Sequence, residues 1–185
     1  TAYEIGVRLV GSEMCIRDSL TTADSKVLID CGINPGARTP SESYPRLDWA
    51  NISLDELDAI VIGHAHLDHT GFLPVLLKYG YKGPIYCTEP TLPMMNLIQL
   101  DAIKVAGAQG RTPMYSETDV HQIMKQAITL SYGTVTDISP DIKLVLANAG
   151  HILGSASCHF IDILFLLIMS AVNRVFISIT VVLFI

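Results

Sequence analysis

The stretch His64-Ala65-His66-Leu67-Asp68-His69 places three imidazoles and a carboxylate within six residues. It directly follows the apolar run Ala59-Ile60-Val61-Ile62, whose β-branched residues predict a buried strand. The ligand-type side chains therefore lie where a rigid strand ends and a loop begins, and the loop can bring them to one point. This density of histidine and aspartate predicts a metal site rather than a solvated loop.

The spacing within this stretch predicts how the donors divide. His64 and His66 point the same way in an extended segment, so both can bind one metal ion. Asp68 and His69 follow as the chain turns, and they can bind a neighbouring metal ion. Imidazole and carboxylate donors suit zinc. We take Asp68 and His69 as the catalytic pair of the site.

His151 is the expected third imidazole of the first metal. It directly follows a predicted strand, and Gly150 and Gly154 flank its loop, which lets the backbone approach a site closely. Three protein donors with one position left for water is the catalytic arrangement of zinc. Such a metal would lower the pKa of water toward about 7 and polarise the bond under attack.

Asp30, at the end of a predicted strand over 26–32, has two interpretations. It can orient a ligand histidine from behind, or it can be an ordinary turn residue, and the sequence leaves both open. His121, in a predicted helix, and His159, which alternates with Cys158 and Phe160 along a further predicted strand, are expected outside the metal site. Cys31 and Cys158 lie beside apolar runs, so we expect buried structural thiols there.

The length, charge and cysteine content limit the kinds of protein that this chain can be. A chain of 185 residues predicts one domain, and 50% hydrophobic residues are enough for a core. The net charge of −6 comes without a basic block, so composition alone gives no reason to expect nucleic acid. The four cysteines are scattered and no signal peptide is in view, which indicates reduced thiols in a cytoplasmic protein.

Strands and helices are predicted to alternate, which favours an α/β layered domain. A short helical turn capped by Ser53 is expected before the histidine stretch, and a helix after it, up to about Tyr79, with Pro74 in its first turn. Residues 37–48 are predicted to form a surface loop. The remaining predictions are strands over 26–32, 59–62, 84–88, 135–138 and 142–147 and helices over 91–108 and 116–130.

The two ends of the chain are expected to differ from the domain at 20–160. Residues 1–19 fit no period and resemble translated adapter sequence, so we expect an artefact or a disordered segment, with an ordinary strand and loop as the alternative. Residues 161–185 are almost wholly apolar. They are either out-of-frame translation or a transmembrane helix. Arg174 falls near their centre, where it costs about 3 kcal/mol, and this favours the first interpretation.

The run from His64 to Gly71 resembles the signature of the metallo-β-lactamase fold. Taken with Leu28–Gly32, Gly83–Thr88 and Ala149–Ala156, it is similar to the β-CASP ribonucleases, above all to archaeal homologues of the endonuclease subunit of the cleavage and polyadenylation specificity factor. The resemblance covers roughly residues 20–160. It predicts an α/β fold that is part of a metallo-β-lactamase αββα sandwich.

The resemblance implies a phosphodiesterase that holds two zinc ions and acts on RNA. Matched positions give His64, His66 and His151 to one zinc ion, and Asp68 and His69 to the other, and Asp30 matches the aspartate of the family's first motif. RNA as a partner follows from the resemblance alone. The resemblance also implies a homodimer in the full-length protein. A membrane partner does not follow from the resemblance and is expected only if the apolar residues 161–185 are genuine.

Three parts of the family pattern are not in this sequence: an aspartate in a Thr-Gly-Asp context that bridges both metals, a further histidine ligand, and an inserted β-CASP domain. We therefore expect one well-formed zinc site and a second, weaker one. Two other functions remain open. The chain could belong to a hydrolase of the same fold that acts on a small ester or thioester, or it could be an inactive or membrane-tethered partial domain.

Overall fold

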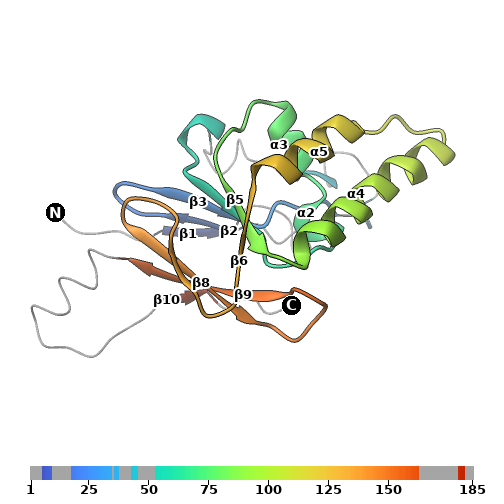
Figure 1. The fold of residues 1–185 in the computed structure, drawn as a ribbon. Coiled ribbons are helices and arrows are strands. Elements are labelled where there is room, and N and C mark those ends of the chain that lie inside the picture. Colours follow the sequence, from blue (N-terminus) through green and yellow to red (C-terminus); the bar gives the residue numbers. More distant parts are fainter. Residues whose placement is uncertain are drawn as a thin grey trace, which may run out of the picture.

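The computed structural model describes residues 6–9, 18–34, 36–37, 43–45, 53–162 and 179–181. It contains two β-sheets packed face to face, with helices on the outer side of one sheet (Figure 1). The first sheet has the strand order β1-β2-β3-β4-β5-β6, and the second sheet has the order β10-β9-β8-β7. The described part therefore supplies helix, sheet and sheet layers of the predicted αββα sandwich.

The strands of the first sheet are β1 (Gly6–Leu9), β2 (Asp18–Thr21), β3 (Lys26–Ile29), β4 (Ala59–Val61), β5 (Ile85–Thr88) and β6 (Ala127–Leu130). The pairs β1–β2 and β2–β3 are antiparallel, whereas β3 to β6 run parallel. The strands of the second sheet are β7 (Val135–Asp137), β8 (Ile142–Asn148), β9 (Ala156–Asp162) and β10 (Ile179–Val181), all antiparallel.

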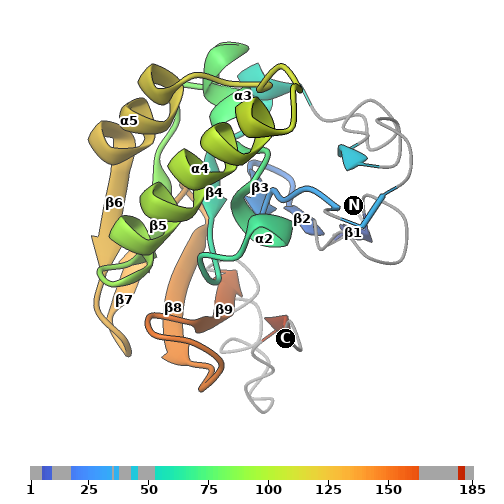
Figure 2. The same cartoon turned by 90° about the vertical axis from the view of Figure 1, so that its right-hand side faces the viewer.

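Helices connect the parallel strands and cover one face of the first sheet (Figure 2). Parallel neighbours need such crossovers because a tight turn cannot join them. The helical elements are the 3₁₀ turn η1 (Leu54–Glu56), α2 (Leu67–Thr70), α3 (Leu73–Lys78), α4 (Thr91–Ala108) and α5 (Glu117–Gln126).

Burial on both faces explains why β3, β4 and β5 are mostly apolar. Val27, Ile29 and Val61 pack into the core between the two sheets. Leu28 and Ile60 point the other way, into the core beneath the helices. Strands covered on both faces lose the alternation of polar and apolar residues that a half-exposed strand shows. The central strands thus hold the site on a rigid base.

The prediction of a helix over 116–130 is wrong at the C-terminal end. The helix begins as expected, with a capping box between Ser116 and Asp119, but α5 stops at Gln126. The next four residues form β6, which pairs with β5 through Ile85↔Ala127. Ile128 and Thr129 are β-branched and favour strand over helix, and the parallel pairing with β5 completes the change.

The helix predicted after the histidine stretch is divided into two. Between α2 and α3 the Phe72 N–H donates to the Cys31 carbonyl at 3.0 Å, which turns the chain back toward β3. Pro74 lies in the first turn of α3, as expected, and the helix predicted over 91–108 is confirmed as α4. The turn after Ser53 is present as η1, without the predicted side-chain cap.

The structure describes only a few residues of each end segment, 1–19 and 161–185. Strand β2 begins at Asp18 and pairs with β1 and β3, so the first sheet includes residues that we expected outside the fold. In the second segment, β10 pairs with β9. The other residues of 1–19 and 161–185, and most of the loop predicted over 37–48, lie outside the described residues. No helix in the described ranges is long and apolar enough to cross a bilayer.

Candidate metal centre

The site lies where the carboxyl ends of two parallel strands meet a hairpin loop of the second sheet. Asp30 follows β3, and Gly63 and His64 follow β4, so parallel pairing brings them to the same edge. His151 lies in the loop between β8 and β9. The Ala156 N–H donates to the Gly63 carbonyl at 2.8 Å, which joins the second sheet to the first at this point.

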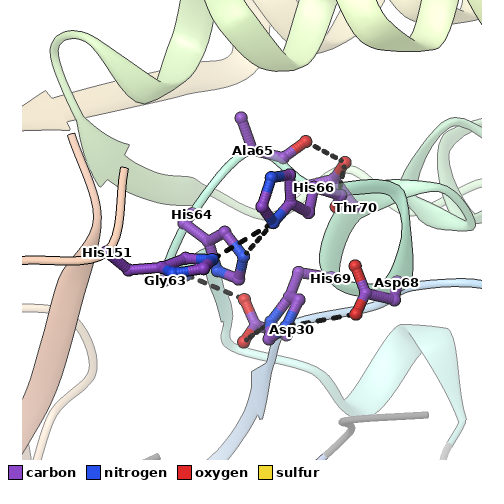
Figure 3. A network of polar contacts seen from close by, with 9 residues as sticks. All are labelled: Asp30, Gly63, His64, Ala65, His66, Asp68, His69, Thr70 and His151. Carbon is purple, nitrogen blue, oxygen red and sulfur yellow. Dashed lines mark hydrogen bonds and ion pairs between the residues drawn. The ribbon is translucent and has the colours of Figure 1, made fainter. Parts of the chain in front are cut away.

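Three imidazoles converge here, and we call His64, His66 and His151 the histidine triad. His64 Nε2 lies 2.9 Å from His66 Nδ1, and His151 Nε2 lies 3.3 Å from the same atom. One ring nitrogen from each residue lies within 4.8 Å of the other two. Figure 3 shows the three rings turned toward one another. The structure thus brings together the residues that the sequence assigned to one metal.

The donor set fits a metal ion. Nitrogens bound to one tetrahedral zinc ion at about 2.0–2.1 Å are about 3.3 Å apart, close to the two nitrogen–nitrogen distances of the triad. Imidazole lone pairs that face one another repel unless a proton or a cation lies between them. His64 is buried and its Nε2 faces the triad, whereas its Nδ1 has no hydrogen-bond partner among the described residues.

The electrostatics of His64 favour a neutral donor. Burial, together with the neighbouring His69, His66 and His151, lowers the pKa of His64 to about 3. A histidine with that pKa is uncharged at neutral pH and keeps one ring lone pair. Within the triad, burial decreases from His64 through His66 to the exposed His151. The open side of the triad is therefore the side of His66 and His151.

Asp30 supports the neighbouring histidine. Its Oδ2 lies 2.7 Å from His69 Nδ1, and its Oδ1 accepts the Gly63 N–H at 2.8 Å. The carboxylate is buried, with 1% of the residue exposed. Its backbone φ of 57° lies in the left-handed region, which aspartate tolerates better than most residues. The carboxylate holds a proton on Nδ1 of His69 and directs Nε2 of this ring away from itself.

His69 and Asp68 lie beside the triad. The ring centroids of His69 and His64 are 3.9 Å apart, and His69 Nε2 lies 3.8 Å from Asp68 Oδ2. Burial alone would lower the pKa of His69, but the hydrogen bond and charge of Asp30 and the charge of Asp68 outweigh it and raise that pKa. The two side chains thus offer an imidazole nitrogen and a carboxylate oxygen next to the triad. In the described ranges, only the triad forms a group of three donors.

Gly32 is a residue whose importance the sequence did not reveal. A Cβ at this position would lie 1.6 Å from the carbonyl oxygen of Asp68. The neighbouring Cys31 N–H donates to the His69 carbonyl at 2.7 Å. Only glycine lets the chain after β3 lie this close to the backbone of α2. In the sequence it was only the last residue of the strand predicted over 26–32 and of the matched stretch Leu28–Gly32, because a contact between residues so far apart along the chain leaves no local pattern.

The other candidate residues lie away from the triad. His121 is exposed on α5, and His159 lies on β9, where its Nε2 is 3.4 Å from Ser157 Oγ. Cys31 and Cys158 are buried in the two apolar cores. The two histidines thus lie outside the triad and the two cysteines are buried, as expected from the sequence.

Comparisons with known proteins agree with this geometry. The sequence profile of the metallo-beta-lactamase superfamily domain matches residues 19–169. The transcription termination factor FttA of Cenarchaeum symbiosum is 85% identical over 141 residues, which are 76% of this chain and 22% of that protein. FttA of Methanothermobacter thermautotrophicus is 52% identical over 140 residues, which are again 76% of this chain and 22% of that protein. The chain thus spans less than a quarter of the length of these relatives.

A likeness to solved structures supports the fold alone. A metallo-beta-lactamase of Cronobacter sakazakii matches with a TM-score of 0.57 and 19% sequence identity. The match covers 85% of this chain and 58% of that one.

Replacing Gly32 by alanine should displace α2 and destabilise the fold. The new Cβ would meet backbone atoms of Asp68, which cannot rotate away, so we expect a loss of more than about 3 kcal/mol in the free energy of unfolding. Gly107→Ala in α4 is the matched control. Its Cβ would meet nothing within 4 Å, and alanine should stabilise the helix by about 0.5–1 kcal/mol. Urea unfolding measures both, and equal stability of the two variants would contradict the close contact at Gly32.

The metal-free chain should lose stability between pH 6.5 and 5. In this range the unfolded state binds a proton on His64 that the folded state excludes, so the free energy of unfolding falls by up to about 1.4 kcal/mol per pH unit as pH decreases. The contribution of His69 changes above pH 6.5, because its folded pKa is raised. His64→Gln should therefore flatten the slope in urea unfolding with a chelator present. A variant slope equal to that of the wild type would disprove this account.

Proposed function

Because the chain belongs to the metallo-β-lactamase superfamily, we propose that it forms part of a zinc-dependent hydrolase that cleaves phosphodiester bonds in RNA. The observation that carries this proposal is the convergence of three imidazole donors within 4.8 Å in the histidine triad. Its relatives are named transcription termination factors, and termination concerns a complex that holds an RNA transcript, which supports RNA as the substrate. The activity of the longer proteins is carried to this chain only as part of the proposal.

The histidine triad would hold one metal ion. The donor atoms are Nε2 of His64, Nδ1 of His66 and Nε2 of His151, the atoms that face one another in the structure. A bound zinc ion supplies a Lewis acid and lowers the pKa of water at the site to about 7. The buried His64 keeps one side of the triad dry, whereas the exposed His151 leaves the other side open to a substrate.

Asp68 and His69 are the proposed catalytic pair, and they would also serve a second, weaker metal site. Asp30 holds the proton on Nδ1 of His69, which leaves Nε2, 3.8 Å from Asp68 Oδ2, as the donor atom of this ring. The Asp68 side chain is 41% exposed, so its carboxylate can reach a substrate on the open side. With only these two donors beside the triad, we propose one well-held zinc ion and a second that binds loosely.

The setting of this activity is part of the same proposal. We place the protein in the cytoplasm, with RNA as its partner, because its relatives are named transcription termination factors. Dimerisation of the full-length protein and a membrane role for residues 161–185 remain predictions from the sequence.

Metal counting tests the triad. The purified chain should bind about one zinc ion tightly, measured by elemental analysis and by competition with a chelator. His151→Ala removes one of three donors and should weaken this affinity by more than the 10–100-fold that loss of an outer partner costs. His121→Ala removes an exposed imidazole on α5 and should change nothing. Equal zinc affinity in the wild type and in His151→Ala would overturn the site, and two tightly held ions would overturn the weak second site.

A substrate comparison tests the reaction. The zinc-loaded chain should cleave labelled single-stranded RNA and leave a thioester intact, and the cleavage should disappear in His151→Ala. We expect a slow reaction, because the chain spans less than a quarter of its relatives. Metal-dependent thioester hydrolysis without RNA cleavage would instead support a small-substrate hydrolase of the same fold.

A further inference from the structure

The loop that carries His151 is held against the helix layer by two buried threonines, which we call the threonine pair. Thr88 is the last residue of β5, and Thr91 is the first residue of α4. Their Oγ1 atoms lie 2.6 Å and 3.0 Å from the carbonyl oxygen of Gly154 and 2.8 Å from each other. Thr88 is 1% exposed and Thr91 is 0% exposed. The hairpin loop of the second sheet is thus joined to the first sheet through a buried polar contact.

The fit around Gly154 is tight. Its φ of +82° lies in the left-handed region, and a Cβ would lie 2.7 Å from Thr91 Oγ1 and 2.8 Å from Thr88 Oγ1. Each hydroxyl has one hydrogen, so the three oxygen–oxygen contacts share two protons. A buried carbonyl that loses its donors is costly, and this holds the loop in one place.

His151 has no support of its own comparable to that of His69. The His69 ring is fixed by Asp30, whereas the exposed His151 ring hydrogen-bonds only to His66 within the described part of the chain. Its direction must therefore come from the backbone of its loop. Ser155 Oγ accepts the N–H groups of His151 and Ile152 at 3.1 Å and 3.2 Å, which shapes the loop from inside. The threonine pair fixes the same loop from outside.

We infer that Thr88 and Thr91 are positioning residues that set His151 against His64 and His66 and so determine the metal affinity of the triad. The inference rests on the proposed function, since it takes the triad as a metal site. In the contacts that the structure describes, the two hydroxyls bond to the Gly154 carbonyl and to each other, and they act on the imidazole through the loop backbone. Valine in place of threonine keeps the branched shape and removes the donor.

Metal binding by the full chain tests this role. We expect the double variant Thr88→Val and Thr91→Val to weaken zinc affinity by about tenfold, measured by chelator competition, and to change the visible absorption spectrum of bound Co²⁺. Thr88→Ser keeps the hydroxyl and should leave the zinc affinity and the Co²⁺ spectrum as in the wild type. Thr22→Val is the matched control, because Thr22 is a buried threonine bonded to Asp141 Oδ2 at 2.5 Å and precedes β3, at the opposite end from Asp30. It should leave zinc affinity and spectrum unchanged.

Amide hydrogen exchange in the metal-free chain gives a second readout. The loop at 149–155 should exchange faster in the single and double valine variants of the threonine pair, and not in Thr22→Val. The single variants carry the test if the double variant does not fold. Unchanged exchange overturns the inference, and so does faster exchange with unchanged zinc affinity. A wild-type chain that binds no metal overturns the proposed function, and exchange alone then decides whether the pair holds the loop.

Discussion

One buried carboxylate joins the parts of the site that come from the first sheet. Asp30 contacts His69 Nδ1 with one oxygen and accepts the Gly63 N–H with the other, so a single side chain joins the end of β3 to the segments that carry His64 and His69. Hydrogen bonds to an ionised carboxylate are short and roughly twice as strong as neutral ones. This arrangement has two local requirements. The backbone of Asp30 lies in the left-handed region, and position 32 must be glycine because the backbone of Asp68 lies so close.

The second half of the site depends on how the two sheets pack. His64 and His66 follow a strand of the first sheet and His151 lies in a loop of the second, so the packing of the two sheets sets the distances within the triad. That core draws on both sheets, with Val27, Ile29 and Val61 from one and Leu144 and Phe160 from the other. Such interiors are packed as densely as organic crystals and do not deform smoothly. The stability of the sandwich and the geometry of the triad are therefore coupled.

Local patterns in the sequence predicted much of this. The period of α4 and the position of the histidine stretch at a strand end are short-range features, and the predicted superfamily is confirmed. The juxtaposition of His151 with His64 and His66 agrees with the sequence interpretation, while their role as ligands remains a prediction. What escaped prediction depends on distant partners. Ala127–Leu130 is a strand because β5 lies beside it, and the contacts of Gly32 and of the threonine pair have no local signature.

The separation of the donors along the chain has a consequence for biosynthesis. His66 and His151 are 85 positions apart, an interval that a ribosome translates in roughly 4–17 s at typical speeds of 5–20 residues per second. Throughout that time the nascent chain has two imidazoles of the triad and a growing first sheet, whose inner apolar face is not yet covered by the second sheet. The complete triad can form only after the second sheet has packed against the first, and until then the inner face of the first sheet is exposed apolar surface of the kind that promotes aggregation.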